Sequence, residues 1–172
     1  MGLILVYELF ILATTIILWS FMTKNGYKNV NRKFLILFLG VLLFEIISEP
    51  MWLNMGFSSW AYLFRDLTWV LTLGWVNTFM IAILAVDNFF KDTSEKKRFF
   101  LYLLFIGALI VPAEGLMLFL GVRGYAPFLL ETMSGLVVPL LKVPVESIFA
   151  VPIFSSLILA FYKYLNYLFD TK

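Results

Sequence analysis

Long apolar stretches separated by short polar segments dominate the pattern of this chain. A helix needs about 20 mostly apolar residues to cross the hydrocarbon core of a bilayer. Five stretches reach that length, and they cover residues 3–22, 34–53, 67–86, 99–120 and 135–162. We therefore predict an all-α integral membrane protein with about five transmembrane helices in a single domain, residues 1–172.

The last apolar stretch differs from the others because it contains several prolines. Pro139, Pro144 and Pro152 each remove a backbone donor. The pattern predicts a last helix broken by prolines, with residues 135–144 forming an irregular or re-entrant entry. In a regular helix, Glu146 would lie near the middle of the membrane, about a dozen residues into the stretch.

Basic residues predict the orientation of the chain. They gather in the segment after the first stretch and in the segment before the fourth, as Lys24, Lys28, Arg32, Lys33, Lys91, Lys96, Lys97 and Arg98. Loops rich in lysine and arginine stay on the cytoplasmic side. We expect a multi-pass protein of the cell membrane, with its N-terminus outside and its C-terminus in the cytoplasm. The first stretch lacks a basic start and a small-residue cleavage site, which predicts a retained helix.

The composition supports this class and narrows the chemistry. The chain is 62% hydrophobic, 19% aromatic and 14% charged, with a mean hydropathy of +0.95. It has no cysteine and no histidine, which excludes thiolate chemistry and the commonest metal ligand. We predict no metal and no cofactor, because nucleotide-binding loops are also missing. No basic stripe interleaved with aromatics indicates a nucleic-acid partner.

Among the acidic residues inside or at the ends of the apolar stretches, Glu49, Glu114 and Glu146 stand out. A carboxyl group in a bilayer is costly and usually functional, so these three are the candidate catalytic residues. The alternative is structural: a protonated carboxyl would donate to a carbonyl freed by a nearby proline, or Glu146 would pair with Lys142.

Further residues are candidates for substrate binding. Glu45 lies four residues before Glu49, so the two share a helix face, and repulsion predicts that at least one is protonated. Aromatic rings can stabilise a cation, or form an interfacial belt without any function. The candidate set for substrate binding is Glu45, Trp60, Tyr62, Trp75, Tyr125 and Phe149.

One spacing occurs twice. Glu49 precedes Gly56 by seven residues and Trp60 by eleven, and Glu114 precedes a glycine and Tyr125 by the same intervals. This predicts an internal repeat of residues 34–86 and 99–162.

The segments 114–127 (EGLMLFLGVRGYAP) and 143–149 (VPVESIF) resemble the membrane lycopene cyclase domain. That family has an acid, an aromatic-proline step and a Pro-x-Glu-Glu motif before Phe. Ser147 stands at the second acid of that motif. Glu49 through Trp60 and on to Trp75 is similar to the related carotenoid hydratases.

The resemblance implies a membrane-embedded cyclase or hydratase of isoprenoids, which works by carboxylic acid and base catalysis through a carbocation, without metal or nucleotide. Glu114 or Glu146 would donate the proton, and Glu49 would be the base. Two other classes stay open: a small proton- or cation-coupled transporter, and a non-catalytic subunit of a larger membrane complex. The expected partners are the lipid bilayer, a hydrophobic isoprenoid substrate, and a second copy or a paired membrane subunit.

Overall fold

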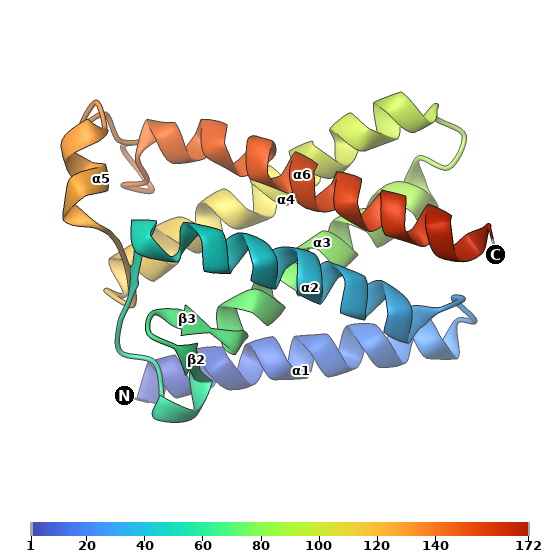
Figure 1. Cartoon of the computed structure of the whole chain (residues 1–172), viewed down its shortest axis with the longest axis horizontal. Coiled ribbons are helices and arrows are strands. Elements are labelled where there is room, and N and C mark those ends of the chain that lie inside the picture. Colours follow the sequence, from blue (N-terminus) through green and yellow to red (C-terminus); the bar gives the residue numbers. More distant parts are fainter. Residues whose placement is uncertain (1, 172) are drawn as a thin grey trace.

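The computed structural model describes residues 2–171 and confirms an all-α membrane architecture. Five of its helices are long and apolar enough to cross a bilayer. They are α1 (Gly2–Lys24), α2 (Val30–Ser48), α3 (Trp69–Phe89), α4 (Glu95–Phe119) and α6 (Val145–Asp170). They lie side by side along one long axis (Figure 1).

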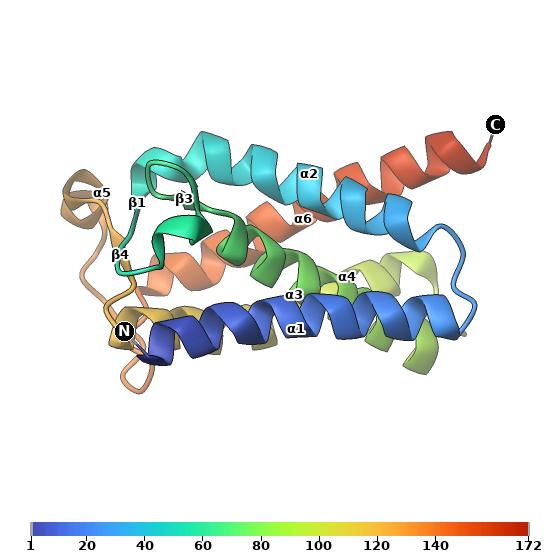
Figure 2. The same cartoon turned by 90° about the horizontal axis from the view of Figure 1, so that it is seen from below.

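Helix α3 is the centre of the bundle. It packs against α1, α2 and α4, while α6 closes the other side by packing against α2 and α4 (Figure 2). Val76, Phe79, Met80 and Val86 on α3 are fully buried. A helix that is apolar all round is typical of this central position. The outer helices instead present rows of exposed apolar side chains, as a surface facing lipid requires.

The two ends of the bundle differ. One end carries two tight connections, between α1 and α2 and between α3 and α4, where most of the basic residues lie. The other end carries all the remaining short elements (Figure 1). These are η1 (Glu49–Met51), β1 (Trp52–Asn54), η2 (Ser59–Ala61), β2 (Tyr62–Phe64), β3 (Leu67–Thr68), β4 (Arg123–Tyr125) and α5 (Pro127–Thr132). We call it the strand end.

The irregular entry predicted for residues 135–144 is confirmed, but α6 itself is not broken by its internal proline. The chain is non-helical from Gly135 to Pro144, where Val137 and Pro144 form an isolated bridge. Helix α6 begins immediately after Pro144 and continues past Pro152 without a break. Proline fits a helix start because its missing donor has no partner there in any case.

This start of α6 corrects the depth expected for Glu146. The residue lies in the first turn of α6, at the strand end, and not in the middle of a span. Its Oε1 accepts a hydrogen bond of 2.7 Å from the backbone N–H of Ser134. Glu146 and Lys142 form no ion pair in residues 2–171.

The end of α4 explains how the chain turns back toward the bundle. Gly121 has φ +67°, a left-handed conformation that glycine adopts without steric cost. The N–H of Gly121 bonds to the carbonyl of Leu118, and the N–H of Val122 bonds to that of Met117. This pair of bonds is a Schellman motif. It stops α4 and sends the next residue, Arg123, into β4.

Candidate functional site

A pair of short antiparallel strands joins two loops that lie far apart in the sequence. Strand β1 follows α2 and strand β4 follows α4, and they align Trp52 with Tyr125 and Asn54 with Arg123. Two further backbone bonds, from Met55 to Val122 and from Ala126 to Met51, extend the pairing. The strand pair therefore fixes the side chain of Arg123 over the C-terminal ends of α2 and α4.

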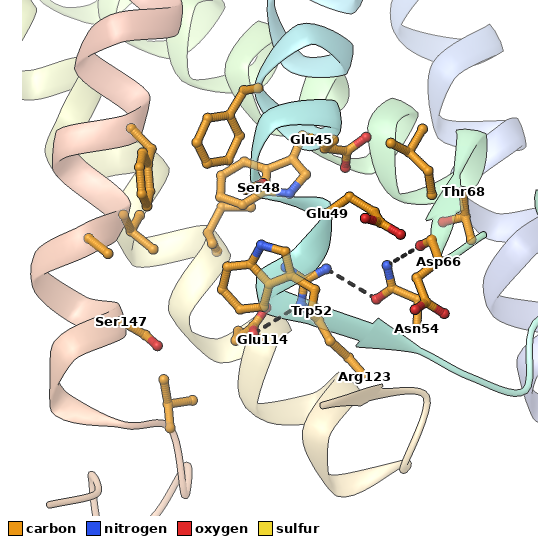
Figure 3. Close-up of a pocket in the computed structure, with 18 of the residues that line it drawn as sticks. Glu45, Ser48, Glu49, Trp52, Asn54, Asp66, Thr68, Glu114, Arg123 and Ser147 are labelled. Atoms are coloured by element: carbon orange, nitrogen blue, oxygen red, sulfur yellow. Dashed lines mark hydrogen bonds and ion pairs between the residues drawn. The ribbon is translucent and has the colours of Figure 1, made fainter. Parts of the chain in front are cut away.

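Arg123 forms a buried ion pair with Glu114. Its Nε lies 3.1 Å from Glu114 Oε1, and the two side chains are only 7% and 8% exposed. Arg123 also donates to Asn54 Oδ1 at 3.4 Å, and its guanidinium lies 4.1 Å from the centre of the Trp52 ring. A buried charge needs a partner and further hydrogen bonds to offset desolvation. The four residues provide this for one another (Figure 3).

Tyr125 links the ion pair to α6. Its hydroxyl lies 3.2 Å from Glu114 Oε1, to which it donates, and 2.9 Å from Ser147 Oγ. Burial, followed by the negative charge of Glu114, raises the pKa of Tyr125 above its usual value. The tyrosine therefore stays protonated and serves as a donor to the Glu114 carboxylate.

A second pair of polar side chains lies between α2 and α3. The hydroxyl of Thr72 donates to Glu45 Oε2. Asn54 joins the ion pair to the turn between β2 and β3, because its amide nitrogen donates to the carbonyl of Asp66 while its amide oxygen accepts from Arg123. Glu45, Asn54, Asp66 and the Glu114–Arg123 pair line one cavity.

These groups line a small cavity inside the strand end of the bundle. Its volume is about 50 Å³, and a buried site needs about 10–15 Å³ of such volume per water molecule. It has room for a few waters and not for a bulky organic group. Figure 3 shows the carboxyl groups of Glu45 and Glu49 on the α2 side and the Glu114–Arg123 pair across from them. Apolar and aromatic side chains complete the wall: Phe44, Trp75, Ile110, Val111, Val143, Val151 and Phe154.

A larger apolar groove lies next to this cavity. It has a volume of about 510 Å³ and runs between α1, α3 and α4. Trp75, Ile110 and Glu114 line both the groove and the small cavity. Asn77 also lines the groove; it is 3% exposed, and its Oδ1 has no hydrogen-bond partner in residues 2–171. A long apolar space therefore meets the polar cavity at Glu114.

The structure brings four of the residues predicted from the sequence together at this cavity: Glu45, Glu49, Trp75 and Glu114. Two more predicted residues, Tyr125 and Tyr62, do not line the cavity but contact residues that do. Tyr125 holds Glu114, and the Tyr62 hydroxyl donates to the carbonyl of Asn54 at 3.0 Å.

Three other predicted residues lie outside the cavity. Glu146 contacts the loop before α6, as described above. Trp60 is 43% exposed, and its ring lies 4.7 Å from that of Trp69. Phe149 is 67% exposed on the outer face of α6. In space, the aromatic residue paired with Tyr125 is Trp52.

Sequence reasoning missed Arg123, the cation that lines the cavity in the described part of the chain. The apolar pattern does not place Arg123 inside the bundle, because the turn at Gly121 that directs it inward leaves only a weak signal in the sequence. A useful signal exists: a buried acid requires a partner, and Arg123 is the basic residue nearest in sequence to Glu114. Asn54, Trp52 and Ser147 give no comparable signal.

No cluster of three or more acidic, cysteine or histidine side chains in residues 2–171 is arranged to hold a metal ion. Comparison with known proteins also gives no assignment, since no family model, no curated protein and no solved structure matches the chain. The function is therefore inferred from the geometry of the site itself.

Proposed function

We propose that this protein is a membrane-embedded enzyme that adds water to a carbon–carbon double bond of a long isoprenoid-like chain. The observation that carries the proposal is that Glu114 lines both an apolar groove of 510 Å³ and an acid-lined cavity of 50 Å³. An apolar substrate and a few water molecules would meet at this residue. The resemblance to carotenoid hydratases points to the same chemistry.

The groove fits a linear apolar chain. Its walls come from three spanning helices and include exposed side chains that face lipid, such as Leu3, Phe10 and Leu116. A substrate dissolved in the bilayer would enter from the side, without crossing an aqueous phase. Binding sites are usually apolar, with a few placed polar groups that fix orientation. Asn77 and Glu114 are such groups here.

The carboxyl groups have different surroundings, which suggests different roles. Glu114 is paired with Arg123 and accepts from Tyr125, so it is the carboxylate of the site. Glu45 lines the same cavity and has no cation within ion-pair distance in residues 2–171. An unpaired carboxyl in apolar surroundings favours its neutral form. Glu45 is therefore the proposed proton donor.

The reaction balances without any cofactor. The O–H bond of the Glu45 carboxyl breaks, and its proton passes through a water molecule of the cavity to one carbon of the alkene in the groove, because Glu45 lines the cavity and not the groove. The other alkene carbon becomes a tertiary cation. The ring face of Trp75 and the Glu114 carboxylate stabilise that cation. A water molecule in the cavity attacks the cation and gives up one proton, which returns to Glu45 directly or through Glu49. The product is a tertiary alcohol, heavier than the substrate by one water.

The size of the cavity favours hydration over cyclisation. Cyclisation beside Glu45 and Glu49 would require the folded end of the chain to enter this cavity, and 50 Å³ is too small for that. The same volume suits water.

We further propose that the strand end faces the outside. The opposite end, which carries the α1–α2 and α3–α4 connections and which we call the basic end, faces the cytoplasm, as the distribution of lysine and arginine indicates.

The test is expression of the chain in a host that accumulates lycopene or other acyclic isoprenoids, followed by mass analysis of the lipids. The expected product is heavier than its precursor by one water. Glu45→Gln and Glu114→Gln should each abolish it. Glu146→Gln should leave it unchanged, because Glu146 lies outside the cavity.

Other outcomes would identify other functions. A new isomer of equal mass would indicate cyclisation and overturn hydration. Unchanged lipids with well-expressed protein, together with proton or cation flux into proteoliposomes that Glu114→Gln abolishes, would indicate the transporter class. Loss of product in Glu146→Gln but not in Glu45→Gln would place the chemistry elsewhere.

A further inference from the structure

A second polar cavity lies at the opposite end of the bundle, and the chemistry proposed above does not use it. Its volume is about 240 Å³. It lies between the end of α1, the first turns of α2, the first two turns of α4, and the C-terminal halves of α3 and α6. Its lining residues are Met22, Tyr27, Lys33, Met80, Ile83, Leu84, Asp87, Arg98, Tyr102, Leu159, Tyr162 and Lys163. Figure 1 shows these helix ends together, near the C-terminus.

The charges around this cavity do not cancel. Lys33, Arg98 and Lys163 supply three positive charges, and Asp87 is the one carboxylate of the lining. Asp87 is already engaged, because it accepts from the Tyr102 hydroxyl and lies 3.5 Å from Arg98. The lining therefore has an excess of positive charge in a space partly walled by apolar side chains, where electrostatic attraction is stronger than in water.

Part of the hydrogen-bonding capacity of these cations is unused. Lys33 forms no ion pair in residues 2–171. Lys163 pairs only with Glu95, whose side chain is 75% exposed. Arg98 Nε is buried and has no acceptor in the described structure. Buried donors normally have a partner, so this cavity offers donors to a ligand that carries several acceptors.

We infer that this cavity binds a phosphate group. A phosphate presents several strong acceptor oxygens and a negative charge, which match one guanidinium and two ammonium groups at the cavity. The volume is several times the about 30 Å³ that one water occupies. The phosphate would belong either to the headgroup of a membrane lipid or to a soluble phosphate compound.

The position favours a lipid headgroup. Lys33 lies in the first turn of α2 and Arg98 in the first turn of α4, at the level where spanning helices leave the hydrocarbon core. Exposed aromatic residues surround this end of the bundle: Phe89, Phe100, Tyr164, Tyr167 and Phe169. Such rings are typical of the membrane interface. Basic pockets between spanning helices on the cytoplasmic side are known to bind anionic headgroups.

The test uses the purified full-length chain in a neutral detergent, with dioctanoyl phosphatidic acid as the probe and calorimetry or native mass spectrometry as the measurement. Dioctanoylglycerol, which lacks the phosphate, is the matched ligand control. Lys33→Gln and Lys163→Gln each remove a charge from the cavity and leave the Asp87–Arg98 pair in place. Lys97→Gln is the matched variant, because Lys97 is exposed, precedes Arg98 and does not line the cavity.

We expect one saturable site for the phosphatidic acid, weakened about fivefold by each cavity variant, as expected for the loss of one lysine beside an anionic headgroup. Lys97→Gln should change the affinity less than twofold. Competition by inorganic phosphate at similar concentration would assign the site to soluble phosphates, and lack of competition would assign it to lipids. Equal weakening by all three variants, or equal binding of dioctanoylglycerol, would overturn the inference.

Discussion

Glu114 and Arg123 lie nine residues apart in the sequence, and their side chains meet at 3.1 Å inside the bundle, almost completely buried. The contact depends on the turn at Gly121, which ends α4 and reverses the chain. It also depends on β1, which pairs with β4 and supplies Asn54 and Trp52 as further partners of the guanidinium. One ion pair thus depends on elements from both halves of the chain.

Removing only the cation of this pair should be strongly destabilising. Arg123→Gln leaves the Glu114 carboxylate buried without its partner, and we expect a loss of about 3–5 kcal/mol in the free energy of unfolding. The measurement is denaturant unfolding in detergent micelles. Arg65→Gln removes a charge from an exposed loop residue at the same end and should cost less than about 1 kcal/mol. If the double variant Glu114→Gln/Arg123→Gln proved as unstable as Arg123→Gln, the pair would not be the cause.

The hydroxyl of Tyr125 should make stability sensitive to alkaline pH. Its pKa is raised in the folded chain, so the folded state keeps a proton that the unfolded chain releases near pH 10. The contribution of the protonated hydroxyl to the free energy of unfolding is complete below pH 10 and is lost as the pH rises above it. Wild type should therefore lose stability above pH 10 more steeply than Tyr125→Phe. Parallel curves for the two proteins would contradict this account. At neutral pH the variant should lose about 1 kcal/mol for its missing hydrogen bonds.

Filling the groove should block activity without harming the fold. A Cβ on Gly74 would make ordinary contacts, 3.6 Å from Ile11 and 3.9 Å from Tyr7. A leucine at this position, however, would occupy the apolar groove that Gly74 lines. We expect Gly74→Leu to reduce product at least tenfold while its melting temperature stays near that of wild type. Gly107→Leu, on a part of α4 with open space around it, is the control. Equal activity of the two variants would argue against the groove as the binding site.

The conformation of Gly121 should be costly to alter. Any side chain at φ +67° is strained, by about 1–2 kcal/mol for alanine. Gly121→Ala should therefore destabilise the protein by that amount. Gly107→Ala, within a helix and free of contacts, should instead be neutral or stabilising by up to about 1 kcal/mol. Thermal unfolding in one detergent compares the two directly. A stable Gly121→Ala would show that the turn does not require a glycine.

The orientation can be tested directly because the chain has no cysteine of its own. Single cysteines at Ser59, in the strand end, and at Lys96, in the basic end, both occupy exposed positions. An impermeant maleimide added to intact cells should label Ser59→Cys, while Lys96→Cys should react only after the membrane is permeabilised. The reverse pattern would overturn the proposed topology and place the second cavity outside.

Much of the fold was readable from the sequence because membrane insertion imposes a strong rule. A backbone in hydrocarbon must satisfy its own hydrogen bonds, so an apolar stretch of sufficient length becomes a helix. The five predicted stretches all became spanning helices, with ends shifted by several residues. The first ten residues of the last stretch form an irregular segment instead of a helix, because Pro144 suits the start of a helix better than its interior.

The structure of the strand end could not be predicted from the sequence, and it determines the site. Strands of two or three residues have no periodicity to detect, and the β1–β4 pairing joins segments about 70 residues apart. That pairing turned Arg123 inward and placed Trp52 beside Tyr125. The starting point of α6 placed Glu146 outside the cavity.

The sequence by itself determined which residues belong in the membrane, and it identified Glu45, Glu49 and Glu114 as acids in apolar surroundings. It could do so because hydrophobicity and the cost of burial are properties of single residues and their neighbours along the chain. Only the tertiary structure decided which acid has a partner. Charges are neutralised through space, and the cation that neutralises Glu114 arrives there through a turn and a strand pairing that depend on both halves of the bundle.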